Sequence, residues 1–173
     1  VAIISNNREE WAVAAYATYG LGAHYVPMYE AQLPKDWKYI LGDCGAKVVF
    51  AATDGIRAQV EEVQGDLPNL VKVIVIDDPA AGDAIDYTEL LALGAEHPAP
   101  VVEVGPEDMA GLIYTSGTTG NPKGVMLSHG NFASNVASTA VVFPLEEDDR
   151  SASFLPWAHS FGQTVELHSL FYW

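Results

Sequence analysis

Residues 109–131 read MAGLIYTSGTTGNPKGVMLSHGN, and the rest of the chain is best interpreted from this stretch. Its first part, residues 109–116, is a short apolar run typical of a buried strand. Residues 116–125 then bring together three glycines, two threonines, a serine and one lysine. Glycine lets backbone N–H groups turn toward an anion, hydroxyls add donors without bulk, and Lys123 adds a positive charge. Because a tight turn needs glycine but not three hydroxyl residues, the stretch predicts a phosphate-binding loop.

On both sides of this loop, short β-branched runs alternate with helical stretches. We expect strands at residues 1–5, 24–29, 47–52, 71–77, 109–116 and 152–158, and helices at residues 7–20, 33–45, 54–67, 87–96, 131–142 and 162–173. Asn7 is expected to cap the first helix, Gly20 to end it, and Asp54 to open the third. Apolar strands that are each followed by a helix are typical of parallel sheets covered on both faces. We therefore predict an α/β fold with a mostly parallel sheet flanked by helices.

Composition narrows the class of protein. The chain has 173 residues, of which 49% are hydrophobic, and its 23 acidic and 8 basic residues give a net charge of −15. Such a surface repels phosphate backbones, so we expect no nucleic-acid partner. The lone Cys44 excludes an internal disulfide and favours a reducing compartment, for which we expect the cytoplasm. Residues 11–29 carry no formal charge, but their glycines and proline predict a buried helix and a strand rather than a transmembrane segment.

Two nucleotide-binding motifs can be tested against the loop. The nucleoside-triphosphatase motif G-x-x-x-x-G-K-[ST], started at Gly117, fails because Pro122 stands at its second glycine and Gly124 at its hydroxyl residue. The dinucleotide fingerprint also fails, because the glycines at 20 and 22 follow a helix and precede a strand. The acidic residues within 145–150 are expected to form a solvated turn, and we predict no metal site there.

The loop as it stands, YTSGTTGNPKGV at residues 114–125, resembles the signature of the adenylate-forming (AMP-binding) superfamily. This superfamily contains acyl-CoA synthetases, adenylation domains of peptide synthetases, and luciferases. The resemblance continues through residues 21–50, LGAHYVPMYEAQLPKDWKYILGDCGAKVVF, and residues 154–171, FLPWAHSFGQTVELHSLF. It therefore covers essentially the whole chain and implies the large N-terminal domain of such an enzyme.

Members of this superfamily join a carboxylic acid to AMP with release of pyrophosphate, and a thiol, usually that of coenzyme A, then takes the acyl group. The resemblance implies a ligase that uses ATP, Mg²⁺ and coenzyme A. It also implies a set of residues that hold the ATP phosphates: Thr115, Ser116, Gly117, Thr118, Thr119, Gly120 and Lys123. The magnesium ligand and the lysine that assists adenylation are expected outside residues 1–173. We therefore assign no catalytic residue and expect these 173 residues alone to be inactive.

The downstream motif bears on the acid that is activated. Amino-acid-activating members carry an aspartate here that pairs with the substrate ammonium, whereas residues 156–162 read PWAHSFG, with no acid before Glu166. Burying an unpaired ammonium is costly, so a plain carboxylic acid fits better. The form LPWAHSFGQTVELH resembles long-chain fatty-acyl-CoA synthetases, which implies a fatty acid. A short-chain, aryl or amino acid remains an alternative, as do a phosphate-loop hydrolase and a non-catalytic nucleotide-binding domain.

The same motif supplies the candidate substrate pocket. His159 resembles a family histidine beside the acyl and adenylate groups, and three neighbours, Trp157, Phe161 and Gln163, are expected to line the pocket with it. His129 and Asn131 are expected to shape the start of the following helix. The remaining histidines, His24, His97 and His168, show no metal-ligand spacing and receive no role.

Residues 96–108 hold three prolines and a glycine and predict a linker. We therefore expect two portions: residues 1–100, with alternating strands and helices, and residues 101–173, with the phosphate-loop strand, a helix and the start of the acyl pocket. Both chain ends fall in apolar runs, which predicts a piece of a longer protein. A lipid substrate leaves peripheral attachment to a membrane open.

Overall fold

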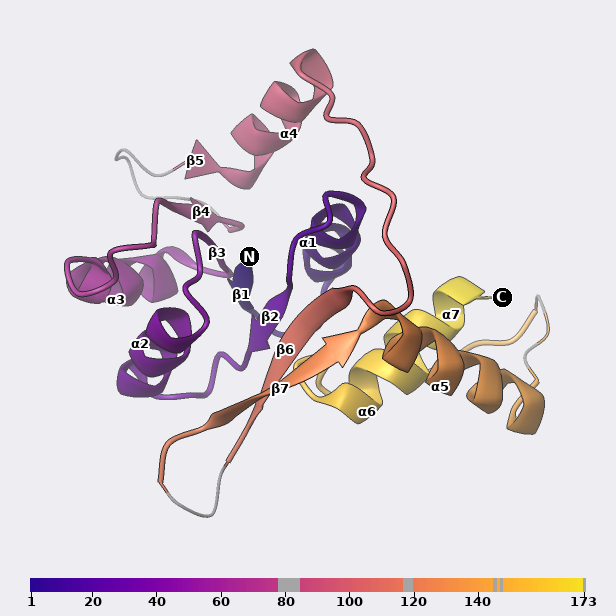
Figure 1. Ribbon diagram of the computed structural model, residues 1–173. Coiled ribbons are helices and arrows are strands. Elements are labelled where there is room, and N and C mark those ends of the chain that lie inside the picture. The colour runs from indigo at the N-terminus through magenta and orange to yellow at the C-terminus, as the bar shows by residue number, and fades with distance from the viewer. Residues whose placement is uncertain (78–84, 117–119, 145, 147, 173) are drawn as a thin grey trace.

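The computed structural model describes residues 1–77, 85–116, 120–144, 146 and 148–172. A five-stranded parallel sheet with the order β2-β1-β3-β4-β5 forms its centre (Figure 1). The strands are β1 (Ala2–Ile4), β2 (Val26–Met28), β3 (Val48–Ala51), β4 (Lys72–Val75) and β5 (Ile85–Asp86). The helices of this portion are α1 (Glu9–Gly20), α2 (Pro34–Asp43), α3 (Asp54–Gln64) and α4 (Tyr87–Glu96). This arrangement confirms the predicted α/β fold with a mostly parallel sheet.

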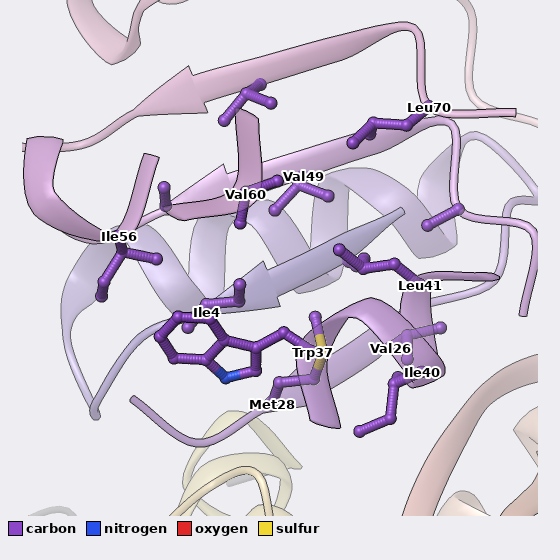
Figure 2. Close-up of a cluster of buried hydrophobic side chains, with 14 of the residues drawn as sticks. Ile4, Val26, Met28, Trp37, Ile40, Leu41, Val49, Ile56, Val60 and Leu70 are labelled. Carbon is purple, nitrogen blue, oxygen red and sulfur yellow. The ribbon is translucent and has the colours of Figure 1, made fainter. Parts of the chain in front are cut away.

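Helices α2 and α3 cover one face of the sheet. Trp37 and Ile40 of α2 and Val60 of α3 are almost fully buried there, against strand residues such as Ile4 and Val49 (Figure 2). Burying an aliphatic or aromatic side chain of this size contributes roughly 1.5–3 kcal/mol. This apolar layer therefore contributes strongly to the stability of the first portion.

Helix α1 covers the opposite face. Trp11 is fully buried and meets the rings of Tyr25 and Trp157 edge-on, with centroid distances of 5.0 and 5.6 Å. Leu167 belongs to the same cluster. The C-terminal part of the chain thus packs on the same face of the sheet as α1.

A second, antiparallel pair consists of β6 (Met109–Thr115) and β7 (Lys123–Ser128). The sequence analysis predicted β6 but not β7. The pair joins the edge of the main sheet at β2, because Tyr25 N–H donates to the carbonyl of Ala110 (2.9 Å) and Leu112 N–H to the carbonyl of Tyr25 (3.0 Å). A Cβ on Gly111 would lie 2.2 Å from the Tyr25 oxygen, so this close approach requires glycine.

The hairpin leads into α5 (His129–Val142), then α6 (Ser160–Gly162), the π-helix η1 (Gln163–His168) and α7 (Ser169–Tyr172). Ser128 and Asn131 form a capping box at the start of α5, which confirms that Asn131 shapes this helix entry. The last predicted helix therefore exists, but its middle is a π-helix.

Two local predictions were wrong. Residues 152–158 form no strand, because their backbone groups are hydrogen-bonded to side chains and not to a neighbouring strand. Asn7 does not cap α1: the cap position is Arg8, and the Asn7 side chain bonds instead to residues 155 and 157. The prediction that Asp54 opens the third helix is confirmed, and Thr53 before it caps α3 by accepting a hydrogen bond from Ile56 N–H.

Candidate functional site

The glycine-rich loop connects β6 to β7, and the mouth of this hairpin brings together two of the predicted phosphate-binding residues. Thr115, the last residue of β6, is the cross-strand partner of Lys123, the first residue of β7. Ser116 follows directly, and all three are exposed. Gly120 has φ = 109°, a conformation that favours glycine. The other predicted members of this set, Gly117, Thr118 and Thr119, lie outside the described residues.

The charge of Lys123 is available to a ligand. Within the described part of the chain the side chain of Lys123 forms no ion pair or hydrogen bond, whereas those of Arg8, Lys38 and Arg57 all pair with carboxylates. An exposed ammonium beside two hydroxyl side chains is a suitable partner for an anion such as a phosphate. In a chain with a net charge of −15, a site for an anion has to be built locally, and the exposed Lys123 gives the hairpin mouth a local positive charge.

The four predicted pocket residues divide between two environments. His159 is exposed and caps α6 by accepting a hydrogen bond at Nδ1 from Phe161 N–H (3.2 Å), and the Phe161 ring is 58% exposed. Trp157, in contrast, packs against Trp11, and the buried Gln163 donates from Nε2 to the Tyr19 hydroxyl (3.0 Å). His159 and Phe161 are therefore exposed to solvent, whereas Trp157 and Gln163 face α1.

Phe161 borders a cleft of about 330 Å³ between α5 and the α6–η1 segment. Thr164 and Val165 line it on the same side as Phe161, and Asn135 and Thr139 of α5 line it on the other. Such mixed walls suit an apolar ligand with a polar group. The sequence analysis did not name these α5 residues, although the spacing of Asn131, Asn135 and Thr139, four residues apart, predicts a polar stripe on one helix face.

The segment before His159 is held from two sides. Asn7 donates from Nδ2 to the carbonyl of Leu155 (2.8 Å) and accepts from Trp157 N–H at Oδ1 (2.8 Å). The buried carboxylate of Glu166 accepts from the Ser153 hydroxyl (2.6 Å) and from the N–H groups of Phe154 and Leu155 (3.2 and 3.1 Å). We call this arrangement of Asn7 and Glu166 around residues 153–157 the backbone clamp.

The electrostatics of the clamp favour an ionised Glu166. Burial by itself would raise the pKa of this carboxyl group. The hydrogen bonds from Ser153 and from the N–H groups of Leu155 and Phe154 outweigh that effect and lower its pKa. Glu166 is thus occupied by the protein's own donors, and the sequence analysis, which noted it only as the first acid after the motif, missed this role.

His168 lies in a different, aromatic environment on η1. Burial lowers its pKa to about 4, so the imidazole is neutral at pH 7. Its Nδ1 shares a hydrogen bond with the Tyr16 hydroxyl (2.9 Å), and Phe132 approaches it edge-on. No role was predicted for His168 from the sequence, and in the structure it is a packing residue of the α1–α5–η1 contact.

Among the described residues, no group of three histidine, cysteine, aspartate or glutamate side chains comes together in a way that could hold a metal ion. No helix in the described ranges is long and apolar enough to span a membrane.

The chain was compared with known proteins. The family model "AMP-binding enzyme" matches residues 1–173. Among curated relatives, the long-chain-fatty-acid–CoA ligase FadD15 of Mycobacterium bovis is 34% identical over 96% of the chain and 28% of its own length. The long-chain-fatty-acid–CoA ligase ACSBG1 of Rattus norvegicus is 32% identical over 100% of the chain and 26% of its own length.

One solved structure extends the comparison to three dimensions. The anthranilate CoA ligase AuaEII in complex with anthranoyl-AMP superimposes with a TM-score of 0.85 and 26% identity, over 99% of this chain and 32% of that chain. The chain spans between a quarter and a third of the lengths of these proteins.

Proposed function

The chain belongs to the AMP-binding enzyme family, and from this premise we propose that it forms the part of a ligase that binds the ATP phosphates, and that this ligase activates a long-chain fatty acid. In the first step a carboxylate oxygen of the acid bonds to the α-phosphorus of ATP, and pyrophosphate leaves. In the second step the sulfur of coenzyme A bonds to the acyl carbon, AMP leaves, and the thiol proton is released. Since the substrate carboxylate is itself the nucleophile, the protein acts by positioning and charge neutralisation.

The observation that carries this proposal is the exposed, unpaired Lys123 directly across from Thr115 at the mouth of the hairpin. The ammonium would neutralise charge on the β- and γ-phosphates, and the hydroxyls of Thr115 and Ser116 would donate to phosphate oxygens. Gly120, with its positive φ, would let the loop follow the phosphates closely. The same contacts would stabilise the departing pyrophosphate, and this is how the loop would promote adenylation.

Two observations support a fatty acid as the substrate. Both curated relatives named above are long-chain-fatty-acid–CoA ligases. In addition, the first acid after the 156–162 motif, Glu166, is engaged by three donors of the protein and is not free to pair with a substrate ammonium. We place the acyl group near His159 and Phe161, beside the cleft between α5 and the α6–η1 segment.

An aryl acid is the second candidate substrate. It is favoured by the high structural similarity to the anthranilate CoA ligase and by the phenyl ring of Phe161 at the cleft.

Enzymes of this family use ATP, Mg²⁺ and coenzyme A in general. Among the described residues no three carboxylate, imidazole or thiol side chains come together to hold a metal ion, and we expect the magnesium ligand outside residues 1–173. We propose a cytoplasmic location from the lone cysteine, and a lipid substrate would also suit peripheral contact with a membrane.

The test is pyrophosphate–ATP exchange by the full-length protein that carries this chain, with palmitate, octanoate, acetate, anthranilate and several amino acids. We expect exchange with palmitate and none with acetate or amino acids. Exchange driven by anthranilate alone would support the aryl candidate. ATP hydrolysis that needs no acid, without exchange, would overturn the proposal.

A further inference from the structure

Tyr114 stands at the point where the hairpin enters the phosphate loop. It lies on β6, one residue before Thr115, and is 7% exposed. Its hydroxyl donates to a carboxylate oxygen of Asp43 at 2.5 Å, a contact between residues 71 positions apart. The side chain of Tyr114 therefore connects the base of the loop to the end of α2.

The position of Asp43 is informative because it is electrostatically unfavourable for a carboxylate. Asp43 is the last residue of α2, where the carbonyl ends of the helix create a partial negative charge. α2 has no basic residue in its last turn to compensate. The hydrogen bond from Tyr114 is the described contact that compensates for this repulsion.

Gly124 makes room for the tyrosine ring. It is the cross-strand partner of Tyr114, and it precedes Val125 on β7, directly after Lys123. A Cβ at Gly124 would lie 3.0 Å from Cζ and 3.2 Å from the hydroxyl oxygen of Tyr114. A side chain at this position would have to displace the ring by a few tenths of an ångström, so the glycine favours the position of the ring across the strand toward Asp43.

These contacts hold β6 at two places. Near its start, the backbone of residues 110–112 bonds to Tyr25 at the edge of the main sheet. At its end, Tyr114 bonds to Asp43, and the loop begins within two residues of that anchor. Fixing Tyr114 also fixes its neighbours on the two strands, Thr115 and Lys123, relative to the sheet.

We propose that Asp43 is a positioning residue for nucleotide binding, which acts through the hydroxyl of Tyr114 to hold Thr115 and Lys123 in the orientation that receives the ATP phosphates. This inference rests on the proposed function of the loop. It adds a residue from the first portion of the chain, far from the loop in sequence, to the machinery of the ATP site.

The experiment measures pyrophosphate–ATP exchange by the full-length protein. KM for ATP is obtained by varying ATP at saturating acid, and KM for the acid by varying the acid at saturating ATP. Tyr114→Phe and Asp43→Ala should each raise KM for ATP about tenfold, because a hydrogen bond to a charged acceptor contributes on this order to an equilibrium. The double variant should be no worse than either single variant, since both remove the same contact. Asp43→Asn keeps an acceptor oxygen and should stay within about twofold of the wild type.

Tyr16→Phe is the matched control. It removes another tyrosine hydroxyl, which shares a hydrogen bond with Nδ1 of His168 at 2.9 Å, and it should lower the melting temperature without changing KM for ATP. If Tyr114→Phe and Asp43→Ala behave like this control, the contact is merely structural and the inference is wrong.

Lys123→Ala distinguishes failure of this inference from failure of the proposed function. If Lys123→Ala raises KM for ATP but Tyr114→Phe and Asp43→Ala do not, the loop binds phosphate and only the positioning role is overturned. If Lys123→Ala also leaves KM for ATP unchanged, the phosphate-loop assignment fails, and the positioning role fails with it.

Discussion

Lys123 shows how much a single side chain can matter in an acidic protein. Three of the basic residues, Arg8, Lys38 and Arg57, are neutralised by carboxylates, whereas Lys123 is exposed at the hairpin mouth. A phosphate that approaches a surface with a net charge of −15 needs such a local positive charge.

Lys123→Ala should therefore lower kcat/KM for ATP by about 10- to 100-fold, the usual value of a charge-assisted hydrogen bond. KM for the acid should not change. Exchange kinetics of the full-length protein provide the measurement. Lys35→Ala, which removes an exposed lysine of α2, is the control and should behave as wild type. Equal effects of the two substitutions would contradict a specific role for Lys123.

His168 predicts how stability depends on pH. Burial lowers its pKa to about 4 in the folded state, below the value near 6.5 in the unfolded chain. Between these two values the unfolded state binds more protons, so the free energy of unfolding falls as the pH falls. His168 alone should account for a loss of about 2 kcal/mol between pH 7.5 and pH 5.

His168→Gln should flatten this dependence, which melting temperatures of the full-length protein from pH 5 to pH 7.5 can measure. His24→Gln replaces an exposed histidine and should keep the wild-type slope. A slope that His168→Gln leaves unchanged would show that other groups carry the acid sensitivity.

Among the individual elements, the π-helix η1 and the irregular segment of residues 153–157 hold each other in place through hydrogen bonds. Glu166 of η1 accepts three hydrogen bonds from this segment, and Asn7, just after β1, holds its other side. An isolated extended segment would leave these backbone groups to water. The backbone clamp replaces the strand partner that the sequence pattern led us to expect, and it sets where His159 begins α6.

Asn7→Ala should weaken the clamp on the Trp157 side. It removes two hydrogen bonds of 2.8 Å and should cost about 1–3 kcal/mol of local stability. Amide hydrogen exchange should accelerate at residues 153–158, and KM for the acid should rise more than KM for ATP. Asn6→Ala, at a neighbouring exposed asparagine whose side chain makes no hydrogen bond among the described residues, is the control. An unchanged exchange rate at these positions in Asn7→Ala would argue against the clamp.

Across the described chain, several long-range connections join the two expected portions. Three of them are the backbone bridge from Tyr25 to residues 110–112, the hydrogen bond from Tyr114 to Asp43, and the clamp by Asn7. The hairpin pair β6–β7 stands beside the main sheet because of the first two connections (Figure 1). The geometry of the candidate ATP site therefore depends on contacts outside the loop itself.

Gly111→Ala tests the bridge between β2 and β6. The added Cβ would lie 2.2 Å from the Tyr25 oxygen, and the backbone must shift, so the loss of stability should exceed about 3 kcal/mol. Chemical denaturation of the full-length protein gives the measurement. Gly94→Ala is the matched control: no atom lies within 4 Å of its added Cβ on α4, and it should stabilise by about 0.5–1 kcal/mol. Similar stabilities for the two variants would contradict close packing of Gly111 against the backbone of Tyr25.

Structural features that depend only on residues close together in the chain can be predicted from the sequence. The alternation of apolar runs with helical stretches predicted the α/β fold, and helix α4 was predicted at residues 87–96, where it lies. The glycine, hydroxyl and lysine residues of 116–125 predicted a loop directly after a strand, and β6 does end at Thr115; phosphate binding by this loop stays a prediction. Strand periodicity, helix periodicity and glycine-rich turns all arise from interactions within a few residues, so these predictions needed no distant partner.

The remaining features depend on partners far away in the chain. Residues 152–158 have a strand-like composition but form no strand, because Asn7 and Glu166 bind their backbone groups. Asn7 is not a helix cap because its amide finds partners about 150 positions away. The pairing of β7, the contact of Asp43 with Tyr114, and the neutral state of His168 likewise follow from folding, which brings these groups together and removes them from water.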